Sequence, residues 1–404
     1  MSKITAVRVS VSMLVISAML SGCGSQRHNE QKPFNYVVGT QTIGANYQFT
    51  DQPVLIETAQ RILDMGSNII KFSLEHPRGS ELSLTELVKH DQNYSRVFDM
   101  PFDFYFLWAY VSSPKINFKD GLSEEEKAAM YDNFYDLSAY LLREYNKTGK
   151  SFYFGHWEGD WSLIDPPYSP KIDPSDTAVE GMIDWLNIKQ KAVEDAQRDI
   201  PHENVYIYTY TEVNMVQKAV KGGKTLTNNV LPHSNVDYVS FSCYDSLYPF
   251  HDASLSMDER KTKMKKLLLE AMDYIESKLP AKDVPGRRVF IGEYGFALEH
   301  VKQPQIQDQF ARTVIKAALK WGCPFVLYWE MYCNTIDHPS SDYLGYGFWM
   351  IDNKGVKQPV YFTHENLLKR GREFVKSYRA EHARNPSGSE YRKVLLDWLN
   401  KNEK

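Results

Sequence analysis

The feature that most constrains the fold is a regular alternation of short apolar segments with longer amphipathic ones. Eight short apolar segments have the length and composition of strands, at residues 36–42, 68–74, 102–111, 151–157, 205–211, 236–243, 288–292 and 324–329. Helical spacing follows each of them except the fifth, whose connection shows the weakest helical pattern, at residues 54–65, 83–90, 123–146, 177–198, 257–279, 305–321 and 364–378. Strands that alternate with helices pair in parallel, and eight such units close into a barrel. We expect a single-domain (β/α)8 TIM barrel; the alternative is an open doubly wound sheet.

The N-terminal segment predicts an export signal and not part of the fold. Lys3 and Arg8 precede an apolar run at residues 9–20, which is too short to span a bilayer comfortably. The following Leu20-Ser21-Gly22-Cys23 resembles the end of a bacterial lipoprotein signal, in which the cysteine becomes the lipid-bearing first residue. The alternatives are an ordinary signal peptide that happens to end in cysteine, or a membrane anchor that is retained.

This interpretation divides the chain into four segments. We expect a signal peptide at residues 1–22, a lipidated tether at 23–33, the barrel at 34–382 and a C-terminal tail with a short helix at 383–404. The lipid on Cys23 would hold the protein on a membrane of the bacterial cell envelope, facing the periplasm or the cell surface. The membrane is therefore one expected partner.

Composition and motifs exclude several classes of function. A formal charge of −4 and a pI near 6.3, with no basic stripe, give no electrostatic basis for binding nucleic acid. Apart from Cys23 the chain has three cysteines, an odd number that provides no disulfide framework. No paired His or Cys motif and no phosphate-binding glycine loop is present, so we expect neither a metal site nor a cofactor.

Polar and aromatic residues follow many of the predicted strands. Glu158, Glu212 and Glu293 lie at the ends of the fourth, fifth and seventh strands, with Tyr244 after the sixth and Trp329 in the eighth. In a barrel the carboxyl ends of all strands surround one mouth, so we expect these side chains to lie close together. Two carboxylates that face each other are the minimum equipment for general acid and nucleophile chemistry on a sugar.

Three motifs resemble those of clan A glycoside hydrolases. Ile291-Gly292-Glu293-Tyr294-Gly295 is similar to the strand-seven motif of the clan, and Tyr328-Trp329-Glu330 to its strand-eight ending. Gly155-His156-Trp157-Glu158 corresponds to the strand-four motif, but Trp157 stands where the clan usually has asparagine. The arginine that the clan often carries on strand two is also missing, and Lys71 is the only basic residue there.

The resemblance implies a retaining, double-displacement hydrolase that acts on a poly- or oligosaccharide. Glu293 would be the nucleophile and Glu158 the acid/base. Trp157 and Trp329 would be platforms for the sugar, and Tyr244 would hydrogen-bond the nucleophile. We expect His156 and Glu212 to bind sugar hydroxyls or to orient the acid/base.

Other interpretations remain open from the sequence. Asp160 and Glu212 compete with Glu158 for the acid role. A glycan-binding lipoprotein on a catalytically degenerate barrel is the main alternative function, because Trp157 departs from the clan pattern. A barrel enzyme with metal-dependent chemistry is a third possibility, against which the missing histidine pairs argue.

Overall fold

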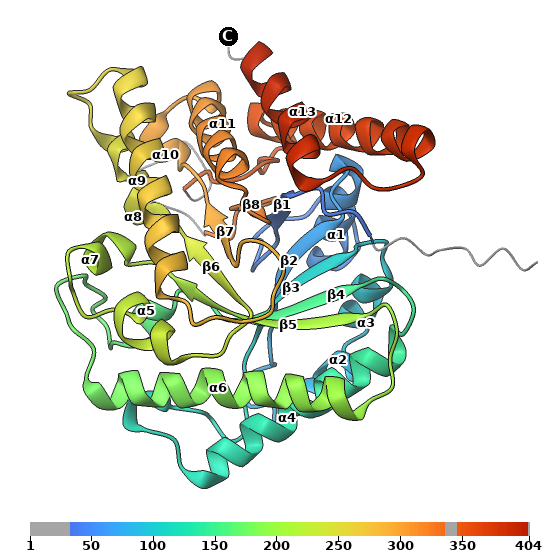
Figure 1. The fold of residues 1–404 in the computed structure, drawn as a ribbon, viewed down its shortest axis with the longest axis vertical. Helices are drawn as coiled ribbons and strands as arrows, with labels where there is room; N and C mark the ends of the chain where they lie inside the picture. The colour runs from blue at the N-terminus through green and yellow to red at the C-terminus, as the bar shows by residue number, and fades with distance from the viewer. Residues whose placement is uncertain (1–32, 336–345, 403–404) are drawn as a thin grey trace, which may run out of the picture. The chain divides into compact units, whose positions relative to one another are not determined.

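The structure is a computed structural model that describes residues 33–335 and 346–402 of the 404-residue chain. Its strands are β1 (Val38–Gln41), β2 (Ile69–Leu74), β3 (Phe104–Ala109), β4 (Ser151–Gly155), β5 (Tyr206–Val213), β6 (Tyr238–Ser242), β7 (Val289–Tyr294) and β8 (Val326–Tyr328). They form one closed barrel in chain order, each strand parallel to the next and β8 paired with β1 (Figure 1). The expected single-domain (β/α)8 barrel is confirmed.

The helices lie on the outside of the barrel (Figure 1). The longer ones are α1 (Val54–Met65), α2 (Leu84–His90), α3 (Gln92–Asp99), α4 (Glu124–Glu144), α6 (Asp176–Asp199), α9 (Met257–Lys278), α11 (Pro304–Trp321), α12 (Pro359–His382) and α13 (Gly388–Lys401). Short helices after the strands are α5 (Gly159–Ser162), α7 (Val216–Val220), α8 (Tyr244–Leu247) and α10 (Leu298–Val301). All seven predicted helices are present, whereas α3 and the short helices were not predicted.

Local sequence explains where these helices begin and end. Ser123 caps α4 and Ser256 caps α9, each in a reciprocal capping box with the glutamate three residues later. Helix α1 ends at Gly66, which adopts a left-handed conformation (φ 101°) that glycine reaches without steric cost. Between β5 and β6 the chain has only α7, a π-helical turn at Leu226–Val230 and a 3-10 turn. This is the connection in which the sequence showed the weakest helical pattern.

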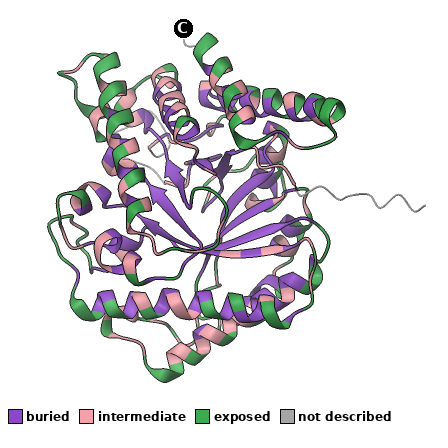
Figure 2. Cartoon of the chain, in the orientation of Figure 1, coloured by how far each residue is buried: buried purple, intermediate pink, exposed green. Residues whose placement is uncertain are grey.

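Aromatic rings fill the barrel interior away from the carboxyl ends of the strands. The rings of Phe106 and Tyr153 stack with centroids 4.4 Å apart, and Phe325 lies edge-on to both, at 4.8 and 5.4 Å. Phe290 closes the same layer at 5.1 Å from Phe106. The strands are buried along almost their whole length, and exposure is confined to the outer helices and loops (Figure 2). Packed side chains thus fill this part of the barrel interior, and a ligand site has room only towards the carboxyl ends of the strands.

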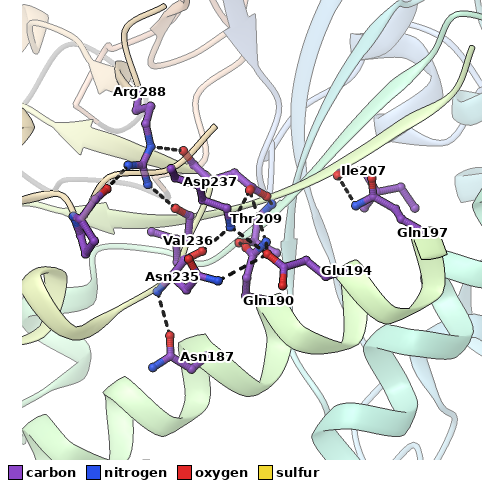
Figure 3. A network of polar contacts seen from close by, with 12 residues as sticks. Asn187, Gln190, Glu194, Gln197, Ile207, Thr209, Asn235, Val236, Asp237 and Arg288 are labelled. Carbon is purple, nitrogen blue, oxygen red and sulfur yellow. Dashed lines mark hydrogen bonds and ion pairs between the residues drawn. The ribbon is translucent and has the colours of Figure 1, made fainter. Parts of the chain in front are cut away.

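A polar clamp fixes the longest outer helix to the barrel. The carboxylate of Asp237, just before β6, accepts hydrogen bonds from the Thr209 backbone N–H (2.8 Å) and from Gln190 of α6 (3.2 Å). Arg288 donates through Nε to the Asp237 carbonyl oxygen at 2.8 Å (Figure 3). One carboxylate and one guanidinium therefore tie α6, β5, β6 and β7 together at the end of the barrel where β5, β6 and β7 begin. A rigid scaffold of this kind is what precise positioning at the opposite end requires.

The C-terminal tail contains the expected short helix. Helix α13 packs against α11 and α12, and Tyr391, Leu395 and Leu399 bury its apolar face. The Tyr391 hydroxyl donates to the carbonyl oxygen of Tyr36 at 2.9 Å, next to the first strand. The tail is therefore packed on the barrel.

The signal peptide, the lipidation of Cys23 and residues 23–32 of the predicted tether lie outside the described residues. Within residues 33–335 and 346–402, no helix has the length and apolar character needed to cross a bilayer.

Candidate active site

A cavity of about 680 Å³ lies at the carboxyl ends of the strands, and we call it the mouth cavity. Its lining combines two carboxylates with a dense set of aromatic rings. The lining residues are Ile43, Trp108, Trp157, Glu158, Tyr244, Glu293, Trp329, Asn334, Thr335, Tyr346 and Phe348. Five of the residues expected from the sequence, Trp157, Glu158, Tyr244, Glu293 and Trp329, are thus brought together.

Glu293 is held on β7, where the register shifts against both neighbouring strands. Such irregularities re-aim side chains near the rim of a barrel. Glu293 is 4% exposed and lies next to Tyr244, and its Oε2 has no protein partner among the described residues. Burial and the nearby charges of Glu158 and Glu212 raise the pKa of Glu293, while Lys71 and the Tyr244 hydroxyl act in the opposite direction. Glu293 is therefore a buried carboxylate at the edge of the mouth cavity, and one of its oxygens has no hydrogen bond that a ligand would have to replace.

Glu158 follows β4 and is 8% exposed. Its Oε1 accepts a hydrogen bond of 2.6 Å from the Ser242 hydroxyl at the end of β6. Burial raises the pKa of Glu158 to about 7; the Ser242 bond lowers it and the charge of Glu212 raises it further. A carboxyl group with this pKa carries its proton in neutral solution about half of the time, as a general acid requires.

A buried ion pair lies directly beneath the two carboxylates. Lys71 Nζ on β2 is 2.9 Å from Glu212 Oε2 on β5, and both side chains are fully buried. The same Nζ donates to the Gly292 carbonyl oxygen at 3.0 Å, next to Glu293. The other oxygen of Glu212 accepts from the backbone N–H of Glu158 at 3.1 Å. A single ion pair therefore connects the backbones of both candidate catalytic residues.

This arrangement changes the interpretation of Glu212. The residue lies inside β5 and not at its end, so its side chain points into the barrel below the cavity and does not line it. Ser240 on β6 donates to Glu212 Oε2 at 2.6 Å, which completes its hydrogen bonding. A direct contact between Glu212 and a sugar hydroxyl is therefore excluded in this structure. The expected alternative, that Glu212 orients Glu158, agrees with the bond to the Glu158 backbone.

Aromatic side chains form the walls of the mouth cavity. The indoles of Trp108 and Trp329 stack with centroids 6.2 Å apart, and Lys71 Nζ lies 4.7 Å from the Trp108 ring centroid. Trp157 is half-buried, and its backbone N–H donates to the Tyr110 hydroxyl at 2.8 Å. Aromatic faces next to hydrogen-bonding groups suit ligands that have both apolar and polar surfaces, as sugars do.

His156 does not reach the mouth cavity, contrary to its expected role in substrate binding. Its Nε2 lies 2.7 Å from Thr211 Oγ1 and its Nδ1 lies 3.0 Å from the Trp157 carbonyl oxygen, so both ring nitrogens are occupied. The ring packs edge-on against Trp185 of α6 at 5.0 Å, behind the strands. Burial, together with the charge of Lys189, lowers the pKa of His156 to about 3. The residue is neutral and holds the backbone next to Glu158.

Asp160, a competitor for the acid role, has a structural environment. Its carboxylate accepts three backbone hydrogen bonds, from Asn214 (3.0 Å), Met215 (3.1 Å) and Leu226 (2.8 Å). These bonds occupy both oxygens and fix the loop after β5, so the Asp160 carboxyl group has no free edge for proton transfer.

A second cavity, of about 700 Å³, adjoins the first, and we call it the side cavity. It shares Glu158 and Tyr244 with the mouth cavity but is not lined by Glu293. Its other lining residues are Trp161, Pro170, Asn214, Met215, Gln217, Lys218, Lys221, Gly223, Ser242, Asp245 and Tyr248. Glu158 and Tyr244 therefore stand at the boundary between two adjoining cavities.

Sequence reasoning passed over several residues that build this site. Ser242 bonds Glu158, and Ser240 bonds Glu212, one layer lower on the same strand. Their two-residue spacing on β6 places both side chains on the inner face, a signal that the alternation rule could have found. The position of Lys71 on β2 was noted only as a departure from the clan. Its role required knowledge of which strand faces it across the barrel.

In the described part of the chain, no group of three or more His, Cys, Asp or Glu side chains is arranged to hold a metal ion. Cys243, Cys323 and Cys333 are buried free thiols.

Comparison with solved structures places this fold among known barrels. A family 5, subfamily 18 glycoside hydrolase from Streptomyces cattleya, in complex with Manβ1-4GlcNAc, matches with a TM-score of 0.56, 14% identity and 90% of both chains covered. A subfamily 18 protein from Bifidobacterium longum subsp. longum, with the same disaccharide, matches with a TM-score of 0.57 and 12% identity over 90% of this chain and 88% of that one. A family 5 lichenase from Caldicellulosiruptor in complex with cellotetraose matches at 0.50 and 15%, over 83% and 92%.

The chain has the (β/α)8 fold of these glycoside hydrolases. No known family model matches the sequence, and no curated protein matches it. At 12–15% identity the structural likeness establishes the architecture. The chemistry must be argued from the residues of this chain.

Proposed function

We propose that this protein is a retaining glycoside hydrolase in which Glu293 is the nucleophile and Glu158 the acid/base. The observation that carries the proposal is that these two buried carboxylates line one aromatic cavity at the mouth of a (β/α)8 barrel. The solved neighbours with this fold are glycoside hydrolases, and two of them hold Manβ1-4GlcNAc. The substrate is a poly- or oligosaccharide, and no cofactor or metal is needed.

The positions of the two carboxylates after β4 and on β7 support these roles, as in the clan that the sequence resembles. Glu293 lines the mouth cavity, and Lys71 favours its ionised form against the larger effects of burial, Glu158 and Glu212, which raise its pKa. Glu158, with a pKa of about 7, supplies the proton. The charge of Glu158 raises the pKa of Glu293, so the protonation of the two groups is coupled.

The reaction has two steps, in which the bonds and protons balance. In the first, Glu293 attacks the anomeric carbon to form a glycosyl ester. The glycosidic C–O bond breaks, and the proton of Glu158 passes to the departing oxygen. In the second, water attacks the anomeric carbon, its proton returns to Glu158, and the ester bond to Glu293 breaks. The sugar leaves with its original anomeric configuration.

A panel of glycans and aryl glycosides tests the proposal, beginning with Manβ1-4GlcNAc and cello-oligosaccharides. Glu293→Gln should reduce kcat at least roughly 1,000-fold on any active substrate, because no covalent intermediate can form. Glu381→Gln is the matched control, since it makes the same change at an exposed position on α12. If Glu293→Gln turns over an active substrate as fast as the unaltered protein, the catalytic assignment is wrong.

A glycan-binding protein without activity is the second candidate, favoured by Trp157 at the position before Glu158. This candidate predicts that the folded protein binds a glycan from the panel and hydrolyses none. Product analysis after prolonged incubation separates the two functions.

We further propose that the protein works outside the cytoplasm on a lipid carried by Cys23. The supporting observation is the sequence Leu20-Ser21-Gly22-Cys23 after a short apolar run. The full chain expressed in bacteria should incorporate labelled fatty acid and partition into detergent, and Cys23→Ser should do neither. Equal labelling of both forms would contradict the anchor.

A further inference from the structure

Glu330 is a buried glutamate to which the proposed chemistry assigns no role. It follows β8 directly after Trp329, and it is fully buried. Trp329 lines the mouth cavity, whereas Glu330 does not. Burial raises the pKa of Glu330 well above its usual range, and two hydrogen bonds from the backbone oppose this effect. Because a carboxyl group is costly to bury, the groups that it bonds indicate what it does there.

The Glu330 carboxyl group contacts two loops. Its Oε1 accepts a hydrogen bond of 2.9 Å from the backbone N–H of Asn334, in the loop after β8. Its Oε2 lies 3.5 Å from the backbone nitrogen of Ile43, in the loop after β1, which is a longer and weaker contact. Both Asn334 and Ile43 line the mouth cavity. We call the two segments, residues 42–47 and 329–335, the β1–β8 wall.

Backbone hydrogen bonds also join the two sides of this wall. The N–H of Asn46 donates to the carbonyl oxygen of Cys333 at 3.1 Å. The N–H of Met331 donates to the carbonyl oxygen of Gln41, at the end of β1, at 3.0 Å. None of these four residues lines the mouth cavity. The Glu330 side chain thus adds a link of a different kind, because it connects lining residues from the two segments to each other.

The wall shares the mouth cavity with the two candidate catalytic residues but supplies neither of them. Glu158 and Glu293 come from β4 and β7. The wall contributes an aliphatic side chain, an indole and an amide, from Ile43, Trp329 and Asn334. Groups of this kind bind a sugar before and during the reaction, so they contribute more to affinity than to the chemical step. They bind well only when they are held in place beforehand.

We propose that Glu330 is a positioning residue, whose buried carboxyl group holds Ile43 and Asn334 in place for binding the sugar in the mouth cavity. Glu330 touches neither the substrate nor the reacting atoms, and it acts through the backbone of the two lining residues. This inference rests on the proposed function, because it requires a sugar in the mouth cavity.

Replacement of Glu330 tests the inference on the substrate that the panel identifies. Glu330→Leu removes both acceptors and keeps a similar volume, so KM should rise roughly 3- to 10-fold while kcat stays within about 2-fold. Glu330→Gln retains one oxygen that can accept from the Asn334 N–H, so KM should rise less, by roughly 2-fold. The kinetics are measured at a temperature at which circular dichroism shows that every variant is folded.

Glu57→Leu is the matched control. Glu57 on α1 is also a buried glutamate, 4% exposed, and its carboxylate accepts from the backbone N–H groups of Phe49 (2.9 Å) and Thr50 (2.7 Å). It also accepts from the Tyr332 hydroxyl of the wall at 2.8 Å. None of these partners lines the mouth cavity. Glu57→Leu should therefore lower the thermal stability and leave KM unchanged.

The outcomes separate this inference from the proposed function. An unchanged KM for folded Glu330→Leu would overturn the inference, as would an equal rise in KM for Glu57→Leu. A lower kcat at constant KM would also overturn it, because the effect of Glu330 would then lie in the chemical step. If Glu330→Leu does not fold, Glu330→Gln decides, and an unchanged KM would then contradict the inference. A protein that binds a glycan without hydrolysing it is tested in the same way through Kd. If the unaltered protein neither binds nor hydrolyses any glycan, the proposed function is wrong and the inference falls with it.

Discussion

Replacement of Lys71 by methionine tests whether the buried ion pair holds the site together. Lys71 Nζ is the cation paired with the fully buried Glu212, and the bond measures 2.9 Å. Methionine fills similar space but leaves Glu212 as a buried charge without a counterion. Removing one partner of a buried pair costs roughly 3–5 kcal/mol, far more than the pair itself contributes. The Gly292 carbonyl oxygen would also lose its 3.0 Å donor.

A double-mutant cycle isolates the cause of this loss. Glu212→Gln removes the charge and keeps an oxygen that can accept from the Glu158 backbone. The double variant, Lys71→Met with Glu212→Gln, should therefore recover about half of the roughly 3–5 kcal/mol lost by Lys71→Met alone. Urea denaturation at pH 7 gives the free energy of unfolding of all four proteins. Strictly additive losses, or a loss below about 1 kcal/mol for Lys71→Met, would refute the argument.

Four further predictions concern single residues around the site. Because the pKa of Glu158 is raised from 4.5 to about 7, the folded state holds this proton more tightly than the unfolded state, so stability falls as the pH rises from about 4.5 to 7. Glu158→Gln should remove this loss, making the variant more stable than the unaltered protein by up to roughly 3 kcal/mol at pH 8 but not at pH 4, in urea titrations. With Glu158 as the acid, kcat/KM should decline above about pH 7, and Ser242→Ala should shift this decline to higher pH; a shift to lower pH would contradict the assigned hydrogen bond. Gly292→Ala would place a Cβ 1.7 Å from Ser240 Oγ, so thermal denaturation should show a loss of at least roughly 2 kcal/mol together with loss of activity. Asp160→Asn should cost roughly 1–3 kcal/mol in the same assay, because the amide NH2 that replaces one oxygen faces a backbone N–H donor, but should leave far more activity than Glu158→Gln.

The barrel could be predicted from the sequence because most of its strands and helices have a recognisable local pattern of apolar and polar residues. Residues 54–65 were predicted as a helix and form α1 with the same limits, since the apolar spacing and Gly66 define both the face and the end. Helix α3 was missed because only Asp91 separates it from α2. Two short helices in succession are too short for a clear helical repeat of apolar residues. The end of β5 was also placed too early, because Glu212 reads as a polar stop although Lys71 neutralises it inside the barrel.

The sequence predicted those site residues that lie at or just after the ends of strands. Glu158, Glu293, Tyr244, Trp157 and Trp329 all line the mouth cavity, as their positions after or at the ends of strands indicated. Contacts across the barrel could not be predicted. The ion pair between Lys71 on β2 and Glu212 on β5 depends on closure of the barrel and not on a local sequence pattern. His156 shows the same limit. Its neighbour in the sequence faces the cavity, but its own ring turns to the outer face of the strands.

The central claim is that Glu293 becomes covalently bonded to the sugar, and mass spectrometry of a trapped intermediate tests it most directly. The protein is incubated with the 2-deoxy-2-fluoro glycosyl fluoride of the sugar that the panel identifies, and its peptides are then sequenced. The account predicts one added glycosyl group on the peptide containing Glu293, and none on Glu293→Gln. A glycosyl group on any other residue, or an active enzyme that forms no adduct and releases an inverted product, would contradict it.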